Sequence, residues 1–155
     1  MKKVFALLIF MVCGPVFAAE LPGTLGDWHS VSKYIQPLIT EYNGESHGNV
    51  TYMTYRRESP SATLDVILTE GTGTGNLYVP EKVNTEKGMM PSDSGFEVLK
   101  VSGHDAIFES RAFMPLALTV RAGDNIILTL ESPSAGRDEL LRTAEVILSS
   151  WRITE

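Results

Sequence analysis

Cysteine is almost absent from this sequence: the only one, Cys13, lies within the first 18 residues. Those residues have the composition of a leader that is removed on export, so we expect the mature chain to contain no thiol. Without thiols it can have no disulfide, no cysteine metal site and no thiol nucleophile. We therefore expect its stability to come from a hydrophobic core alone.

Basic residues are also few. The chain has 13 Lys and Arg against 19 Asp and Glu, which gives a formal net charge of −6 at pH 7. Losing Lys2 and Lys3 with the leader would lower that charge by two, to −8. Nucleic acid is a poor partner for such a surface, because binding phosphates requires clustered Lys and Arg. We therefore exclude nucleic acid as a partner.

Histidine, the side chain that titrates near neutral pH and most often binds metals, occurs only as His29, His47 and His104. None has a carboxylate nearby in a recognised ligand register except the neighbouring pair His104-Asp105, whereas a zinc site needs three or four converging ligands. The glycine-rich run at 71–75 lacks the Lys and the Ser or Thr that complete a phosphate-binding loop. We expect no metal and no cofactor.

Catalytic motifs are missing as well. The chain has no Gly-x-Ser-x-Gly motif for a nucleophilic serine. Glu109 with Asp65 or Glu70 could flank a cleft if their strands are neighbours, but alternation places them on the solvated face of a sheet, where large pKa shifts are not expected. We favour a non-enzymatic protein. The alternative is a hydrolase-like enzyme built from dispersed residues such as His104, Glu109 and Asp65.

The first 18 residues have the pattern of a signal peptide. Lys2 and Lys3 precede an apolar run at 4–12, and small residues follow up to Ala18, after which we expect cleavage. The apolar run is about half of the ~20 residues that span a bilayer, so we predict no transmembrane helix in the mature chain. The domain organisation expected is a signal peptide at 1–18 and a single domain at 19–155.

This leader predicts a protein that is periplasmic or secreted. The alternative is a lipid anchor on Cys13. We favour it less, because Val12 occupies the position where bacterial lipoprotein signals have Gly or Ala.

The second half of the chain has the pattern of strands followed by one helix. Apolar and polar residues alternate in four runs separated by turn residues, as in half-buried strands. The four predicted strands are 96–101, 106–114, 116–121 and 126–131. From about Ala135 to Trp151, apolar residues recur every three or four positions, which predicts a helix with one apolar stripe, capped by Ser134.

The first half of the chain is less regular. Residues 50–57 and 63–69 predict a hairpin, because they are rich in strand-forming residues and flank a turn. Apolar residues at roughly helical intervals predict a short helix from Ser30 to Gln36. The glycine-rich segment from Gly71 to Gly95 is too long to be a structureless loop, so we expect part of it to pack.

Together these patterns predict an α+β fold. We expect a single domain with an antiparallel sheet of about five to six strands, a C-terminal helix packed on one face and a short N-terminal helix. Over roughly the last 60 residues, the turn-linked strands of 96–130, followed by Glu139-Leu140-Leu141 opening a terminal helix, resemble small exported α+β proteins of the PsbP/Mog1-like kind. The resemblance implies an accessory or partner-binding protein. It rests on element order and assigns no functional residue.

Aromatic and methionine side chains supply the predicted binding site. Tyr55 in the first hairpin and Tyr78, Met89 and Met90 in the glycine-rich segment could form an adaptable apolar surface beside the sheet. The function expected is therefore an exported, non-enzymatic protein that binds an envelope protein partner or a small ligand. Besides the enzyme, a structural or inhibitory subunit of an envelope complex remains an alternative.

Overall fold

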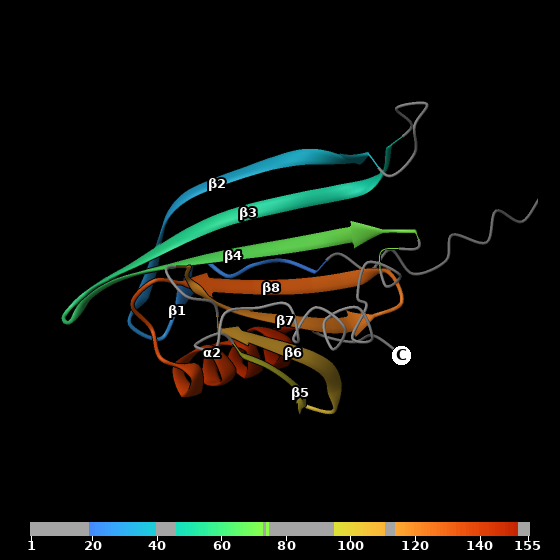
Figure 1. Ribbon diagram of the computed structural model, residues 1–155. Helices are drawn as coiled ribbons and strands as arrows, with labels where there is room; N and C mark the ends of the chain where they lie inside the picture. The colour runs from blue at the N-terminus through green and yellow to red at the C-terminus, as the bar shows by residue number, and fades with distance from the viewer. Residues whose placement is uncertain (1–18, 40–45, 73, 75–94, 111–113, 152–155) are drawn as a thin grey trace, which may run out of the picture.

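The computed structural model describes residues 19–39, 46–72, 74, 95–110 and 114–151. This part of the chain contains eight strands and one helix (Figure 1). The strands are β1 (Thr24–Leu25), β2 (Trp28–Ile39), β3 (Ser46–Glu58), β4 (Ser61–Gly71), β5 (Gly95–Val101), β6 (His104–Ser110), β7 (Leu116–Gly123) and β8 (Ile126–Ser132), and the helix is α2 (Arg137–Ser150). Within these ranges, α2 lacks the length and hydropathy that a membrane-crossing helix needs.

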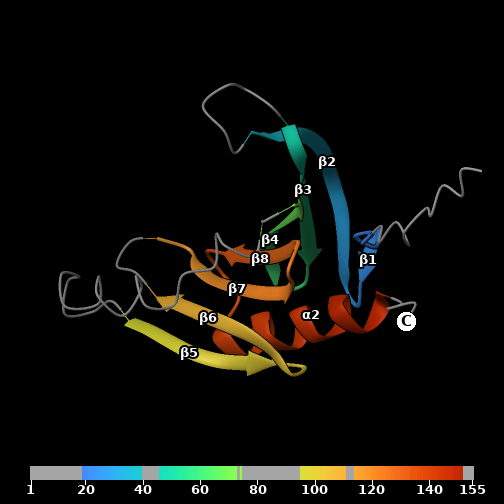
Figure 2. The same ribbon diagram turned by 90° about the vertical axis from the view of Figure 1, so that its right-hand side faces the viewer.

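All eight strands form one antiparallel sheet in the order β1-β2-β3-β4-β8-β7-β6-β5. Strands β1 to β4 and strands β5 to β8 are two meanders, and the pairing of β4 with β8 joins them. Figure 2 shows that the sheet curls, so that α2 lies on its concave side. The far halves of β2 and β3 extend away from the helix (Figures 1 and 2).

The hydrophobic core lies between α2 and one face of the sheet. Val66, Leu130 and Leu118 stand opposite one another in β4, β8 and β7, and all three are fully buried. Leu140 and Ile147 of α2 are also fully buried against this layer. Each layer removes the hydrocarbon of the other from water, which is what the predicted one-sided strands and one-sided helix require. The predicted docking of the terminal helix on the sheet is confirmed.

The predicted fold class is wrong in two respects. The sheet has eight strands instead of five to six, and no N-terminal helix occurs among the described residues. Residues 30–36, predicted to be that helix, lie within β2. Their aromatic and β-branched side chains suit a strand, and pairing with β3 along its length outweighed the helical spacing of the apolar positions. Pro37 is compatible with this position, because a strand at a sheet edge tolerates a missing N–H.

The start of the helix also differs from the prediction. Helix α2 begins at Arg137, its N-cap residue is Gly136, and no side chain caps it there. Instead the hydroxyl of Ser132 accepts hydrogen bonds from the N–H groups of Ser134 and Ala135, at 3.2 and 2.9 Å. The serine that organises this turn is therefore Ser132, two residues before the predicted cap.

Candidate functional site

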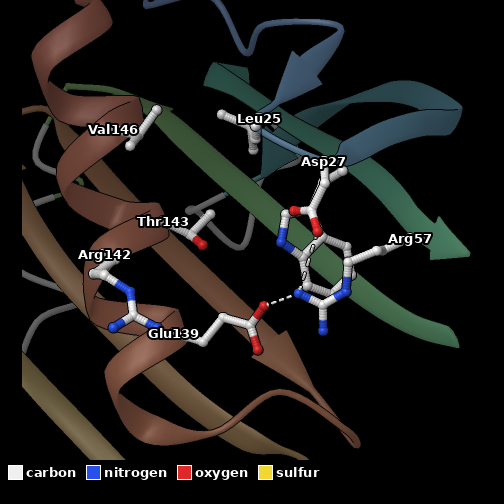
Figure 3. A pocket seen from close by; sticks show the side chains of 9 residues that line it. Leu25, Asp27, Arg57, Glu139, Arg142, Thr143 and Val146 are labelled. Carbon is white, nitrogen blue, oxygen red and sulfur yellow. Dashed lines mark hydrogen bonds and ion pairs between the residues drawn. The ribbon is translucent and has the colours of Figure 1, made fainter. Parts of the chain in front are cut away.

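A pocket of about 300 Å³ lies between the turn that joins β1 to β2 and the exposed flank of α2 (Figure 3). Its lining residues are Leu25, Gly26, Asp27, Trp28, Arg57, Glu139, Arg142, Thr143 and Val146. In Figure 3 the helix side chains form one wall, and Leu25 and Asp27 face them from the β1–β2 side. The pocket therefore brings together three segments that are far apart in sequence.

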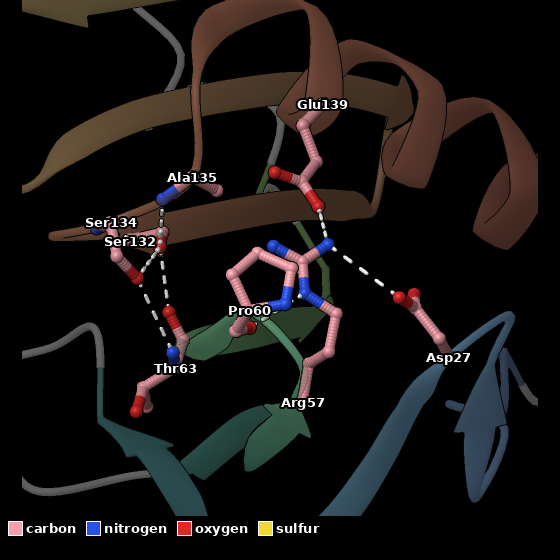
Figure 4. A network of polar contacts seen from close by, with 8 residues as sticks. All are labelled: Asp27, Arg57, Pro60, Thr63, Ser132, Ser134, Ala135 and Glu139. Atoms are coloured by element: carbon pink, nitrogen blue, oxygen red, sulfur yellow. Dashed lines mark hydrogen bonds and ion pairs between the residues drawn. The ribbon is translucent and has the colours of Figure 1, made fainter.

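Arg57, near the end of β3, is the central charged residue of this pocket. Its guanidinium forms an ion pair with Glu139 of α2 and lies 3.7 Å from the carboxylate of Asp27. It also stacks over the ring of Trp28 at 4.5 Å. In Figure 4 the guanidinium lies beside Pro60, to whose carbonyl it donates at 3.2 Å. Only 13% of the side chain is exposed, so most of its charge is compensated by these contacts instead of by water.

A second polar group joins the sheet to the turn before the helix. The Ser132 hydroxyl donates to the carbonyl of Thr63 in β4 at 2.6 Å, while it accepts from the turn that leads into α2 (Figure 4). Arg57 and Ser132 therefore hold the first turn of α2 to β3 and β4.

The chemistry available in this pocket is limited. Its lining contains no histidine, cysteine or serine, so it lacks the Ser–His and Cys–His pairs that activate a nucleophile. Arg57 is already bound by both carboxylates of the lining. Arg142 is the one cation of the lining with no ion pair among the described residues, and it is exposed. We conclude that the pocket is mainly a structural junction between helix and sheet.

The more distinctive surface is the outer edge of β2. Strand β1 is only two residues long and pairs with Trp28 and His29. From Val31 to Ile39, β2 pairs with β3 on one side, and on the other side no strand of the described part of the chain lies beside it. Except at Pro37, which has no N–H, the backbone groups along this side have no strand partner among the described residues and could pair with a further strand.

Large hydrophobic side chains are exposed along this same edge. They are Val31, Tyr34, Ile35 and Ile39, with exposed fractions of 55 to 62%. Tyr34 stacks on Tyr52 of β3 with ring centroids 4.6 Å apart and an 8° angle between the planes. Gln36 donates to the Tyr52 hydroxyl at 3.0 Å, which fixes this ring in turn. The two tyrosines therefore form a rigid apolar surface on the face of the hairpin that points away from α2.

The opposite edge of the sheet, β5, is built differently. It is seven residues long, and its charged residues Glu97 and Lys100 pair with Arg137 and Asp105 at 2.6 Å each. Hydrogen bonding to Lys100 lowers the pKa of the Asp105 carboxyl, as expected for a paired acid. Val98 is the only large hydrophobic side chain of β5 that is strongly exposed. Paired charges on a short strand discourage the addition of another strand, so the two edges differ in their capacity to bind one.

Of the four predicted binding residues, Tyr55 alone lies among the described residues. Tyr55 is fully buried, and its hydroxyl donates to the carbonyl of Pro22 at 2.6 Å. Burial raises the pKa of this hydroxyl to about 12. Tyr55 is therefore a core residue in this structure. Tyr78, Met89 and Met90 lie outside the described residues, and their assignment to a binding surface stays a prediction.

The dispersed catalytic set does not converge. Asp65 of β4 pairs with Glu131 of β8, which pairs with Ala117 of β7, which in turn pairs with Glu109 of β6. Asp65 and Glu109 are therefore three strands apart, which is about 14 Å at the usual strand spacing. Thr54 donates to Asp65 at 2.7 Å. His104 lies on the other face of the sheet, because it alternates with the outward-facing Glu109. Within the described ranges, no three His, Cys, Asp or Glu residues are grouped so as to hold a metal ion.

The β2 edge escaped the sequence-based analysis for a physical reason. An edge strand is recognised by what does not pair with it, and pairing partners are set by the fold. The only available signal was the run of β-branched and aromatic residues between Val31 and Ile39, which also fits a helical interval.

Comparison with known proteins gives no match: no family model, no curated protein and no solved structure is significantly similar to this chain. The resemblance to PsbP/Mog1-like proteins therefore stays a prediction.

Proposed function

We propose that this chain is an exported, non-enzymatic protein that binds an extended segment of a partner protein along the outer edge of β2. One observation supports this above all. Four of the seven large hydrophobic side chains that the described residues expose lie on this one strand, whose outer edge has no neighbour among them. Isolated exposed hydrophobic residues are ordinary, but their grouping on an unpaired strand edge is typical of a binding surface.

The mode of binding follows from strand geometry. A partner segment that adds to β2 gains its affinity from main-chain hydrogen bonds and its specificity from alternate side chains. Tyr34 and Ile35 point to opposite faces of the sheet, because neighbouring strand residues alternate. The partner segment therefore meets a tyrosine surface on one face and an aliphatic one on the other.

Charge indicates which kind of segment fits. Lys33 is the only residue of β2 with a formal charge. Among the described residues, Lys33 has no carboxylate partner. An acidic, extended partner segment would supply one. A second copy of this chain would instead bring another Lys33 and no carboxylate of β2 to this edge.

Export is part of the proposal, and the sequence of residues 1–18 supports it. A partner for this edge would then be a protein of the cell envelope or of the medium.

Two synthetic peptides of about ten residues provide a direct test, one alternating Val with Glu and one alternating Val with Lys. The mature chain is titrated with each peptide, and amide hydrogen exchange is followed residue by residue by NMR. We expect the acidic peptide to slow exchange in Val31–Ile39 and to bind about tenfold more tightly than the basic one. Substituting Lys33→Glu should reverse that preference.

A matched pair of substitutions serves as control. Ile35→Ser should weaken binding of the acidic peptide, whereas Val98→Ser, which removes a comparably exposed residue from β5, should not. The proposal is wrong if neither peptide changes exchange in β2, or if Lys33→Glu leaves the preference as it was. It is also wrong if the free chain sediments as a dimer with β2 already protected, because a second copy is then the occupant.

A further inference from the structure

The backbone nitrogen of Ala19 lies beside an acidic side chain. Its N–H donates to the carboxylate of Glu70, near the end of β4, at 3.2 Å. Glu70 is only partly exposed, and burial raises the pKa of its carboxyl, an effect that the Ala19 N–H opposes. A carboxylate in such a place is stabilised by a nearby positive charge.

We propose that cleavage after Ala18 creates this positive charge, so that the new α-ammonium group of Ala19 forms an intramolecular ion pair with Glu70. The inference rests on the export that we propose above. It goes further by assigning the new terminus a structural role.

The chemical step is an ordinary hydrolysis by an endopeptidase of the export machinery. Water adds across the peptide bond between Ala18 and Ala19, and the Ala18 carbonyl carbon takes the hydroxyl group. The Ala19 nitrogen takes the remaining proton and becomes an amine, which gains a further proton from solvent at neutral pH. An uncharged N–H donor opposite the Glu70 carboxylate is thereby replaced by a cation at the same position, which adds the attraction between opposite charges to the existing hydrogen bond.

The residues after Ala19 are bound to the fold one after another, which holds the new terminus in place. The Glu20 carbonyl accepts from the indole N–H of Trp151 at 3.1 Å, and Leu21 is 4% exposed within the core. The Pro22 carbonyl accepts from the Tyr55 hydroxyl.

The next residue, Gly23, continues this series. Its carbonyl accepts from the N–H of Ser30 at 2.9 Å. Ala19 itself packs against the core. The N-terminal segment is therefore part of the folded domain, and its first nitrogen does not depend on a flexible tail to reach Glu70.

The rival processing route gives a different result. Acylation at Cys13 would leave residues 13–18 attached, so the nitrogen of Ala19 would remain an amide and could bind Glu70 only as an uncharged donor. The ion pair thus distinguishes the two mature forms by structure as well as by mass.

The test is a double-mutant cycle on the mature chain at about pH 6.5, where ordinary α-amino groups are cations and ordinary carboxyl groups are anions. Its four members are the chain beginning at Ala19, the same chain acetylated on Ala19, and both again with Glu70→Gln. Acetylation keeps the N–H that donates to Glu70 and removes only the charge. We expect it to lower Tm by roughly 3 °C in the parent chain and by less than about 1 °C in the Glu70→Gln variant.

Glu145→Gln is the matched control, because this exposed acid of α2 makes no ion pair among the described residues. Acetylation should lower Tm in the Glu145→Gln chain as much as in the parent. Equal losses in the parent and in the Glu70→Gln variant would refute the ion pair and leave export intact.

N-terminal sequencing of the protein recovered from the cytoplasm, the envelope and the medium of the producing cells addresses the premise separately. A first residue of Ala19 supports the inference. A different first residue overturns the assignment of Ala19, and retention of the full leader on an unexported chain overturns the proposed export as well. None of these three results bears on the binding of peptides to β2, which is measured on the folded domain.

Discussion

The guanidinium of Arg57 lies 4.5 Å from the ring of Trp28 while the same group binds Glu139 across the junction of helix and sheet. Arg57 therefore contacts three parts of the chain at once: the start of β2, the turn between β3 and β4, and the first turn of α2. A planar guanidinium suits this position better than an ammonium group, because it can stack and donate in several directions together.

Removing the charge of Glu139 should destabilise the fold. We expect Glu139→Gln to lower the free energy of unfolding by about 2 kcal/mol, because Arg57 would remain largely buried with only the more distant Asp27 as a counter-charge. Urea unfolding followed by tryptophan fluorescence measures this. Asp124→Asn, which breaks the exposed pair with Arg121, should cause no measurable change. Equal stabilities for the Glu139 variant and the parent would show that Arg57 does not join helix and sheet.

Ser132→Ala should also destabilise the fold strongly, although it removes only one oxygen atom. The Ser132 hydroxyl is the hydrogen-bond partner of the Thr63 carbonyl and of the Ala135 N–H, and the side chain is fully buried. We expect the free energy of unfolding, measured with denaturant, to fall by about 2 kcal/mol. This is the size of the effect when a well-placed serine at the start of a helix is replaced by alanine.

The neighbouring Ser134→Ala is its control. Its hydroxyl is exposed and makes only contacts of 3.4 to 3.5 Å, so the loss should stay within about 0.5 kcal/mol. A larger loss of stability for Ser134→Ala than for Ser132→Ala would mean that the predicted cap, Ser134, organises the turn.

Tyr55 predicts how stability changes at alkaline pH. Its hydroxyl has a pKa of about 12 in the folded chain, raised by burial from an ordinary value near 10. The unfolded chain therefore loses this proton first as the pH rises. Stability should fall between about pH 10 and pH 12, by on the order of 2 kcal/mol.

Tyr55→Phe should remove that part of the pH dependence, although it also costs about 1 kcal/mol at neutral pH through the lost bond to Pro22. Unfolding curves collected across this pH range, for parent and variant, provide the measurement. Identical alkaline slopes for the two chains would contradict the assigned pKa.

Gly48 should not tolerate a side chain. A Cβ at this position would lie 1.8 Å from the carbonyl oxygen of Glu70 and 2.6 Å from the Cα of Gly71. Both are backbone atoms of the paired strand, so relief requires β3 and β4 to separate locally. We expect Gly48→Ala to lower the free energy of unfolding by about 3 kcal/mol. Gly95→Ala in β5, where a Cβ has no neighbour within 4 Å, should be nearly neutral.

The second half of the fold could be predicted because its patterns are one-sided. Leu118 and Leu128 lie on the apolar side predicted for their strands, and both prove fully buried. In α2, the buried residues Leu140, Ala144 and Ile147 recur at the predicted three- and four-residue steps. Where one face of a strand or helix is buried and the other is exposed to solvent, apolar residues recur in the sequence with the period of that element.

Strand β2 lacked such a signal. Most of its residues are exposed on both faces, so burial imposes no two-residue period on them. Its extended form depends on hydrogen bonds to β3, which pair Lys33 with Met53 and Ile35 with Thr51. Similarly, nothing local to Arg57 indicates that Glu139, 82 residues later, will meet it.

What the sequence by itself determined is the local part: which residues have an apolar side, where turns fall, the absence of thiols from the chain after Cys13, and the leader-like composition of residues 1–18. These depend on spacing along the chain and on side-chain chemistry. Only the tertiary structure decided the eight-strand order, the position of β2 beside the edge of the described sheet, the partners of Arg57 and the contact between Ala19 and Glu70. Each of these depends on which distant segments meet, and that is decided by the combined burial and hydrogen bonding of the whole chain.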